Sequence, residues 1–401
     1  MRRVVTGPRQ AGRPGSGRPK SPTVWFSPRP RAYATMAAGD GCRAAHQRGK
    51  EGAPMGEMRI ASGLCLALDF GGTKLAAGLV NWRTGEVLRQ ARCATVGSRG
   101  ARGQIADMLG LVEGELGLAG AGRPAIDAVG VSFGGPVDTG RGIVLQSHHV
   151  EGWEGLPLAA ELGATFHCPV YLENDANAVA LGEYRYGAGR GARTVVYITV
   201  STGIGGGIVL EGELWRGSHG VAGEVGHMVV RPGGPLCTCG NRGCLESLAS
   251  GPSIARRARE ALAGGGGSRT AAGGGSRTAP TDDSRTAPTI VAIAGSEEAI
   301  TAEHVFRAAR AGDPLAAQVV ASTAEDLGLA IAMLASIVDP ERVILGGGVA
   351  KAGEQLLAPV RAAFARHAFP LLAGRVAIVQ AAAIDEGGLL GAAALVAQAH
   401  R

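Results

Sequence analysis

Residues 64–81 read LCLALDFGGTKLAAGLVN, two apolar runs joined by a short polar turn that contains two glycines. Each run has the length and apolar continuity of a buried strand, so we predict a strand, a tight turn and a second strand. After the carboxylate of Asp69 and the ring of Phe70, the turn supplies two glycines, a hydroxyl and an ammonium within GGTK at 71–74. Such groups can hold phosphates and orient a metal ion, although a hairpin turn without a ligand explains the same residues.

Two further glycine-rich turns lie at the ends of predicted strands. One is STGIGGG at 201–207, which includes Thr202 and Gly203, and the other is GGG at 346–348. A Walker loop is absent and no G-x-G-x-x-G follows a strand, so the two common nucleotide signatures are missing. Three unrelated hairpins are the alternative explanation. Three glycine turns at strand ends can also close around one nucleotide, and we predict such a site.

Predicted strands alternate with predicted helices along the rest of the chain. After the pair at 64–70 and 75–81, strands are expected at 128–132, 170–172, 194–199, 206–210 and 342–345. Helices are expected at 103–118, 176–186, 253–263, 301–311, 314–338, 354–367 and 387–400. This alternation predicts an α/β fold.

The basic charge of the chain is concentrated in its first 58 residues. The sequence has 401 residues, 45% of them hydrophobic and 18% charged, which suits a globular protein of two or three domains. Residues 1–58 carry 11 Lys and Arg against 3 Asp and Glu, whereas the remainder carries 29 against 31. The near-neutral remainder argues against a nucleic-acid surface.

Two segments lack the periodicity of helices and strands. We expect residues 1–58 to be a disordered basic extension, which leaves open a targeting arm, an anion-binding tail or upstream sequence translated from a misassigned start. Residues 264–288 repeat SRTA three times in a background of Gly, Thr and Pro, so we expect a flexible surface insertion there.

A histidine and three cysteines form a metal-ligand pattern. His227, Cys237, Cys239 and Cys244 offer one imidazole and three thiolates, the ligands of a closed tetrahedral zinc site. A redox thiol pair and an iron centre are the alternatives, but C-x-C departs from the redox C-x-x-C and no fourth cysteine lies nearby. The other cysteines are scattered, and no apolar run approaches the roughly 18 residues of a membrane span. We therefore expect structural zinc, a cytoplasmic location and no membrane partner.

Carboxylates gather around the segment ENDAN at 173–177 and around the metal-ligand pattern. Asp175 follows a predicted strand and opens a predicted helix, so a helix N-cap explains it as well as a general base does. Glu224 lies three residues before His227, and Glu246 lies two residues after Cys244. Hydrogen-bond acceptors held by a metal site can bind a ring of hydroxyls, which favours the general base.

In these motifs the chain resembles the ROK family of sugar kinases and repressors, a branch of the actin-like, hexokinase-like ATPases. DFGGTK, ENDANA, STGIGGGI, the E-V-G-H box with C-x-C-G-x-x-G-C-x-E, and DPERVILGGGV occur in the family's order over about 64–399. The resemblance implies two α/β domains of ribonuclease H-like fold around a cleft. We expect a smaller N-terminal domain over 59–177 plus 386–401, and a larger domain over 178–385 that carries the zinc site and the insertion.

The resemblance also implies roles for individual residues. Asp175 becomes the base that accepts a proton from a sugar hydroxyl during transfer of the γ-phosphoryl group of ATP. The implied sugar-binding residues are Asn174, Glu224, His227, Glu246 and Gly135, with His227 using one ring nitrogen for zinc and the other for the sugar. Asp69 would hold the Mg²⁺ of MgATP, usually through water. The implied nucleotide-binding residues are Gly71, Gly72, Thr73, Lys74, Thr202, Gly203, Gly346, Gly347 and Gly348.

Two departures from the family pattern lie near the implied sugar site. Gly134 stands where proline is usual, and His149 stands where asparagine is common. The resemblance favours glucose and leaves N-acetylmannosamine, fructose or another hexose open. A sugar-responsive repressor and a sugar-binding protein without turnover are the rival functions; residues 1–58 lack the helix pair of a winged helix-turn-helix. A homodimer or homotetramer is expected.

Overall fold

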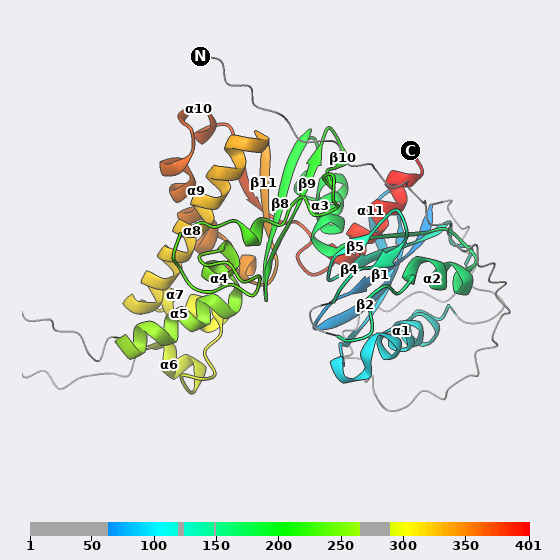
Figure 1. The fold of residues 1–401 in the computed structure, drawn as a ribbon, viewed down its shortest axis with the longest axis horizontal. Coiled ribbons are helices and arrows are strands. Elements are labelled where there is room, and N and C mark those ends of the chain that lie inside the picture. The colour runs from blue at the N-terminus through cyan, green and yellow to red at the C-terminus, as the bar shows by residue number, and fades with distance from the viewer. Residues whose placement is uncertain (1–62, 119–123, 148–149, 265–288) are drawn as a thin grey trace, which may run out of the picture. The chain divides into compact units, whose positions relative to one another are not determined.

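The computed structural model describes residues 63–118, 124–147, 150–264 and 289–401 (Figure 1). The predicted extension over 1–58, the three SRTA repeats and His149 lie outside the described residues. Within the described ranges the strands form two five-stranded sheets and one two-stranded ribbon.

The first sheet is built around the strand pair predicted from residues 64–81. Its strand order is β3-β2-β1-β4-β7, with β1 and β2 antiparallel and with β4 and β7 parallel to β1. The strands are β1 (Leu64–Phe70), β2 (Lys74–Asn81), β3 (Glu86–Ala94), β4 (Ala128–Phe133) and β7 (Val170–Asn174). β3 was not predicted because it is an edge strand whose side chains are largely exposed, which removes the apolar run that marked its neighbours.

The second sheet repeats this arrangement. Its order is β10-β9-β8-β11-β12, with β8 and β9 antiparallel, β11 parallel to β8, and β12 parallel to β11. The strands are β8 (Thr194–Val200), β9 (Ile204–Leu210), β10 (Glu213–Leu214), β11 (Arg342–Gly346) and β12 (Ala377–Gln380). The ribbon pairs β5 (Val137–Asp138) with β6 (Ile143–Val144). Each glycine turn predicted from the sequence therefore lies at the end of β1, β8 or β11.

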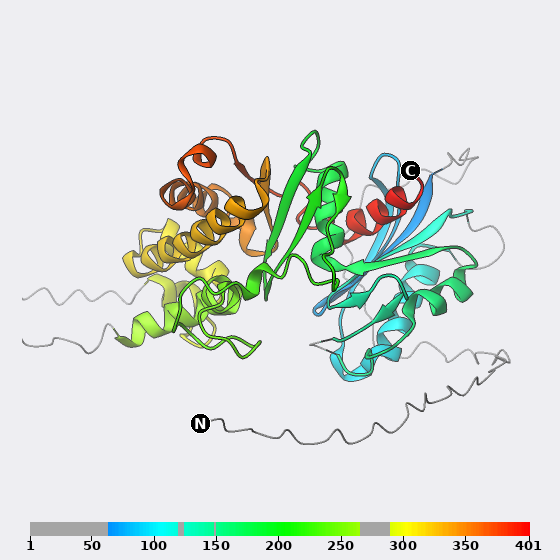
Figure 2. The same ribbon diagram turned by 45° about the horizontal axis from the view of Figure 1, so that its top comes forward.

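Helices cover both sheets (Figures 1 and 2). We call the part of the protein around the first sheet the first half and the part around the second sheet the second half. The helices of the first half are α1 (Gly100–Gly110), continued by one π turn at Leu111–Glu115, and α2 (Leu158–Phe166). Those of the second half are α4 (Leu245–Ala249), α5 (Gly251–Gly264), α6 (Thr289–Ala294), α7 (Ala302–Arg310), α8 (Pro314–Val338), α9 (Glu354–His367) and α10 (Pro370–Ala373). The helix predicted at 103–118 thus lies three residues earlier, at 100–115 with the π turn included, and α2 was not predicted.

Two helices connect the halves. α3 (Asp175–Tyr186) packs against β8 and β9, and also against α11 (Gly387–Ala399), which returns to pack on β1 and β4. The return requires glycine at Gly130 of β4, because a Cβ there would lie 1.9 Å from the carbonyl oxygen of Ala392. The C-terminal helix therefore packs on the first sheet, far in sequence from the strands it covers.

Both halves have apolar cores. Trp153 is fully buried beneath the first sheet and contacts the rings of Phe70 and Phe133 at centroid distances of 5.6 and 4.8 Å. In the second half, α8 is by length and composition apolar enough to cross a membrane. However, 61% of its most apolar window is buried, so α8 packs as a core helix.

Candidate functional site

The carboxylate of Asp69 lies at the end of β1 between β4 and α11. It accepts a hydrogen bond from Ser132 Oγ at 2.8 Å. A Cβ on Gly388, in the first turn of α11, would lie 2.2 to 2.5 Å from the carboxylate atoms, so only glycine allows this approach. Burial raises the pKa of Asp69, and the Ser132 bond and the charges of Lys74 and Arg92 oppose that rise.

The turn after β1 presents its polar groups to solvent. Gly71 N donates to Lys74 O at 3.0 Å, and Thr95 Oγ1 donates to Gly71 O at 2.7 Å. Gly72, Thr73 and Lys74 are exposed, and Lys74 begins β2. The turn is thus fixed at its base and open at its tip.

Asp175 is the first residue of α3, and the N-cap is its neighbour Asn174. The Oδ1 atom of Asn174 accepts from Asn177 N at 3.2 Å, so the N-cap explanation considered for Asp175 is wrong. Asp175 Oδ1 instead accepts from Ala176 N at 2.8 Å and from Asn174 Nδ2 at 3.1 Å. Burial raises the pKa of Asp175 to about 6, and the negative charges of Asp69 and Glu224 contribute to the rise.

The sequence did not predict Arg216 or the contacts that orient the start of α3. Glu173 is buried and pairs with Arg216, with Nε and Oε2 2.6 Å apart, and it accepts from Asn177 Nδ2 at 3.2 Å. Asn174 Nδ2 also donates to Gly135 O at 3.2 Å. Arg216 is 43 residues from Glu173 in the sequence, so no local pattern indicated the pair.

The second glycine turn is held by residues that follow the metal-ligand pattern. Glu246 Oε2 accepts from Ile204 N at 3.0 Å, and a Cβ on Gly203 would lie 2.7 Å from the same oxygen. Gly251 N donates to Ser201 O at 2.7 Å. Glu246, predicted to bind sugar, therefore lies directly against the turn predicted to bind phosphate.

The third glycine turn lies against the end of β8. A Cβ on Gly346 would lie 2.4 Å from Tyr197 Oη, and one on Gly347 would lie 2.5 Å from Val200 O. Gly347 also has a φ of 81°, which favours glycine. These two positions allow the β8 and β11 turns to meet.

A cavity of about 300 Å³ brings the first and third turns together with both carboxylates. Its polar and glycine lining comprises Asp69, Thr73, Lys74, Asp175, Thr199, Ser201, Gly347, Gly348, Lys351, Asp385, Gly387 and Gly388, together with Tyr197. A second cavity of about 990 Å³ adjoins it and shares Ser201, Gly348 and Lys351. Thr202 lines the second cavity with side chains that the sequence did not single out, among them Arg259, Ile300, Phe306, Arg307 and Arg310.

A buried carboxylate fixes the segment that leads into α11. Glu183 of α3 accepts from Ala188 N at 2.8 Å, Ala382 N at 3.1 Å and Ala383 N at 2.8 Å. One side chain therefore holds both connections between the two sheets, the first from α3 to β8 and the second from β12 to α11. The second of these connections carries Asp385 into the smaller cavity.

The four predicted metal ligands lie together. His227 Nδ1 is 3.6 Å from Cys237 Sγ, Cys239 Sγ is 3.7 Å from Cys244 Sγ, and all four ligand atoms lie within 4.8 Å of one another. Ligands about 2.0 to 2.3 Å from a tetrahedral zinc ion are separated by roughly 3.3 to 3.8 Å, so the cluster fits zinc after a small contraction. Because Nδ1 faces the sulfurs, His227 Nε2 is directed toward Glu224 Oε2, 4.0 Å away.

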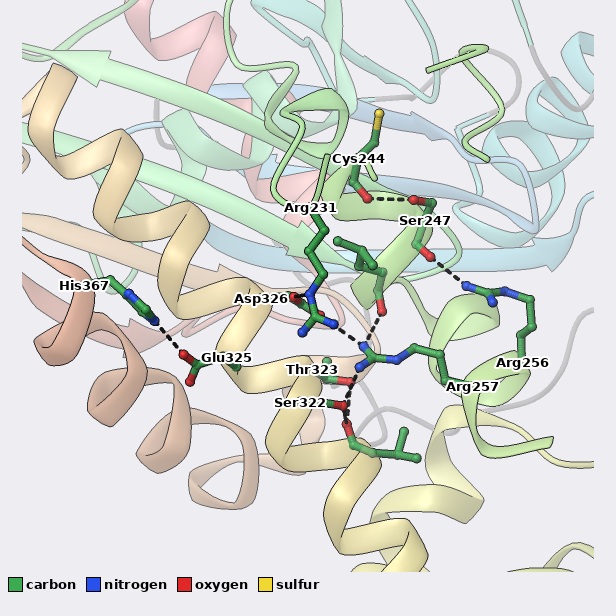
Figure 3. Close-up of polar contacts among 12 residues, drawn as sticks. Arg231, Cys244, Ser247, Arg256, Arg257, Ser322, Thr323, Glu325, Asp326 and His367 are labelled. Atoms are coloured by element: carbon green, nitrogen blue, oxygen red, sulfur yellow. Dashed lines mark hydrogen bonds and ion pairs between the residues drawn. The ribbon is translucent and has the colours of Figure 1, made fainter. Parts of the chain in front are cut away.

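The segment 227–244, which carries the metal-ligand pattern, is anchored to α5 and α8 by two arginines that pair with the buried carboxylate of Asp326 (Figure 3). Asp326 of α8 is 1% exposed; Arg231 Nε lies 2.5 Å from one of its carboxylate oxygens and Arg257 Nη1 lies 3.1 Å from the other. Arg257 also donates to Leu248 O at 2.8 Å, and Ser247 Oγ donates to Cys244 O at 2.8 Å. These bonds hold the segment independently of a metal ion.

The predicted sugar-binding residues do not line the smaller cavity. Asn174 contacts Gly135, the Glu224 and His227 side chains are 52% and 36% exposed, and Glu246 contacts the second glycine turn. Glu224 nevertheless lies near enough to raise the pKa of Asp175. The grouping of these residues around one sugar stays a prediction.

Comparison with known proteins agrees with the sequence resemblance. The profile of the ROK family matches residues 65–399. A glucokinase of Thermotoga maritima is 35% identical over 331 residues, 82% of this chain and 96% of that protein. An N-acetylmannosamine kinase of Yersinia pseudotuberculosis is 33% identical over 328 residues, 82% of this chain and 96% of that protein. The crystal structure of a ROK family glucokinase from Streptomyces griseus with glucose and AMPPNP has a TM-score of 0.68 at 36% identity, covering 84% of this chain and 100% of that one.

Proposed function

This chain belongs to the ROK family, and on that basis we propose that it is a kinase that transfers the γ-phosphoryl group of ATP to a hexose, preferably glucose. The observation that carries the proposal is the smaller cavity, which places Asp175 beside Asp69, Lys74 and the turn at Gly347. A base, a candidate metal-binding carboxylate, a cation and a glycine turn are the groups that phosphoryl transfer requires in one place.

The residues of the cavity divide the work of the reaction. Asp175, with a pKa of about 6, is mostly ionised at pH 7 and accepts the proton of the attacking hydroxyl. Asp69 would hold Mg²⁺, which neutralises phosphate charge when bound. Lys74 and the main chain of the glycine turns position the phosphates, and the larger cavity accommodates the nucleoside. The four-ligand cluster would hold zinc without an open position, which makes that ion structural.

The identity of the sugar is tested by a substrate screen. We expect ADP release with several hexoses and the highest kcat/KM with glucose, since three of the relatives matched at 35 to 37% identity are glucokinases. N-acetylmannosamine and fructose belong in the same screen. A higher kcat/KM with either would assign the kinase to that sugar, and no ADP release with any sugar would leave a binding protein without turnover.

The raised pKa of Asp175 predicts the pH dependence of the reaction. Because the base must be ionised, kcat/KM for the sugar should be level above about pH 7, fall to half of that value near pH 6 and be roughly tenfold lower at about pH 5. The measurement is kcat/KM from pH 5 to 8, with the melting temperature recorded at each pH to show that the protein stays folded. A profile that is level down to pH 5 would contradict an ionised Asp175 as the base.

A further inference from the structure

One charged residue lies where the two cavities meet. Lys351 belongs to the 3₁₀ turn Val349–Ala352, directly after the third glycine turn. Of the described residues, Ser201, Gly348 and Lys351 line both cavities, and Lys351 is the charged member of the three. A nucleotide with its nucleoside in the larger cavity and its γ-phosphate near Asp175 would pass its phosphate chain through this junction.

The ammonium of Lys351 is paired with a carboxylate inside the smaller cavity. Lys351 Nζ lies 2.5 Å from Asp385 Oδ1, and the two side chains are 54% and 64% exposed. The hydrogen bond from Lys351 lowers the pKa of Asp385, so this carboxylate is ionised at neutral pH. Exposed ion pairs stabilise a fold little, which means that another anion can replace Asp385 at small cost.

We propose that Lys351 is a ligand of the donor's phosphate chain, and that Asp385 holds its ammonium over the cavity until the phosphates replace the carboxylate. The inference rests on the proposed function, since it takes a nucleotide as the donor. Lys74 contributes a second cation from the turn after β1, so the phosphates are contacted from both halves of the protein.

The arrangement predicts opposite effects for the two partners of the ion pair. Loss of Lys351 removes an attraction for phosphate, whereas loss of the Asp385 charge removes a competitor for Lys351 and a repulsion against phosphate. A purely structural ion pair predicts the same effect from either change. The comparison of Lys351→Met with Asp385→Asn therefore separates a phosphate ligand from a surface contact.

The experiment measures the dissociation constants of MgADP, Mg-AMPPNP and adenosine by calorimetry for the wild-type chain and its variants. We expect Lys351→Met to weaken both phosphate-bearing ligands about tenfold, equivalent to about 1.4 kcal/mol, and to leave adenosine unchanged. Lys351→Arg should stay within about threefold of wild type because the charge is kept. Asp385→Asn should bind the phosphate-bearing ligands as tightly as wild type or more tightly.

A matched control removes a cation of another exposed pair. Arg193→Met breaks the pair with Glu211, whose atoms lie 2.7 Å apart and which lines neither cavity, and should leave all three dissociation constants unchanged. Unaltered MgADP binding in Lys351→Met, an equal loss of adenosine binding, or an equal loss in Asp385→Asn would each overturn the proposal. Failure of the wild-type chain to release ADP with any sugar would instead contradict the proposed function, and the wild-type assay alone reveals it.

Discussion

Asp175→Asn is expected to lower kcat by about 10²- to 10⁴-fold, the usual cost of losing a positioned general base. Sugar affinity should stay within a few-fold of wild type, because the amide keeps an oxygen for Ala176 N and is matched in shape to the carboxylate. α3 should remain capped, since Asn174 and not Asp175 is its N-cap. The measurements are kcat, the sugar dissociation constant and the melting temperature of both proteins.

The melting temperature carries information of its own. Because burial raises the pKa of Asp175 from 3.8 to about 6, the folded protein favours the protonated carboxyl. The stability that this carboxyl contributes is present below pH 3.8 and is lost as the pH rises through about 6. Asparagine resembles the protonated form, so at pH 8 the variant should melt at or above the wild-type temperature. A variant that keeps more than about a tenth of wild-type kcat would show that Asp175 is not the base.

The parts of the fold that could be predicted are those whose burial is continuous along the sequence. β1 and β2 are buried almost throughout, so an apolar run marked both. β3 lies at an edge and α2 begins after Pro157 without a side-chain cap, so neither carried a clear local signal. The helix start at 174–175 was displaced by one residue because asparagine and aspartate are equally good N-caps.

The predictable part of the site is likewise local in sequence. Four metal ligands within 18 residues could be recognised from their spacing, as could glycine turns at strand ends. The side chains that connect these turns to distant parts of the chain could not be recognised. Lys351 pairs with Asp385 across 34 residues, and Glu183 reaches Ala382 and Ala383 across about 200, so only folding brings these groups together.

The metal cluster includes His227, which faces Glu224, and lies next in sequence to Glu246, which contacts the second glycine turn, so loss of the metal should affect the predicted sugar and nucleotide sites unequally. His227 Nε2 faces Glu224, and Nδ1 would bind the ion, so the orientation of this pair would depend directly on the metal. The second glycine turn contacts the segment around the cluster less directly, through Glu246, whose carboxylate accepts from Ile204 N at 3.0 Å, and through Gly251 N, which donates to Ser201 O at 2.7 Å. Bonds from Asp326 to Arg231 and Arg257 hold the surrounding segment without a metal.

Cys239→Ser is therefore expected to lower the zinc content well below one ion per chain and to weaken glucose binding by roughly tenfold or more, while MgADP binding changes by no more than a few-fold. Cys239 is the exposed member of the cluster, so the change disturbs packing least.

Zinc content, the dissociation constants of glucose and MgADP, and the melting temperature are measured for this variant and for Cys168→Ser. Cys168 is a half-buried thiol outside the cluster, so its replacement should change none of the binding values. Because the ion pairs of Asp326 with Arg231 and Arg257 persist in the variant, a cooperative melting transition should remain. A change in glucose affinity then reports the orientation of His227 and Glu224. Wild-type glucose affinity in a zinc-free variant would show that the ion has no role in sugar binding. A loss of MgADP binding equal to the loss of glucose binding would show that Glu246 transmits the full effect to the second glycine turn.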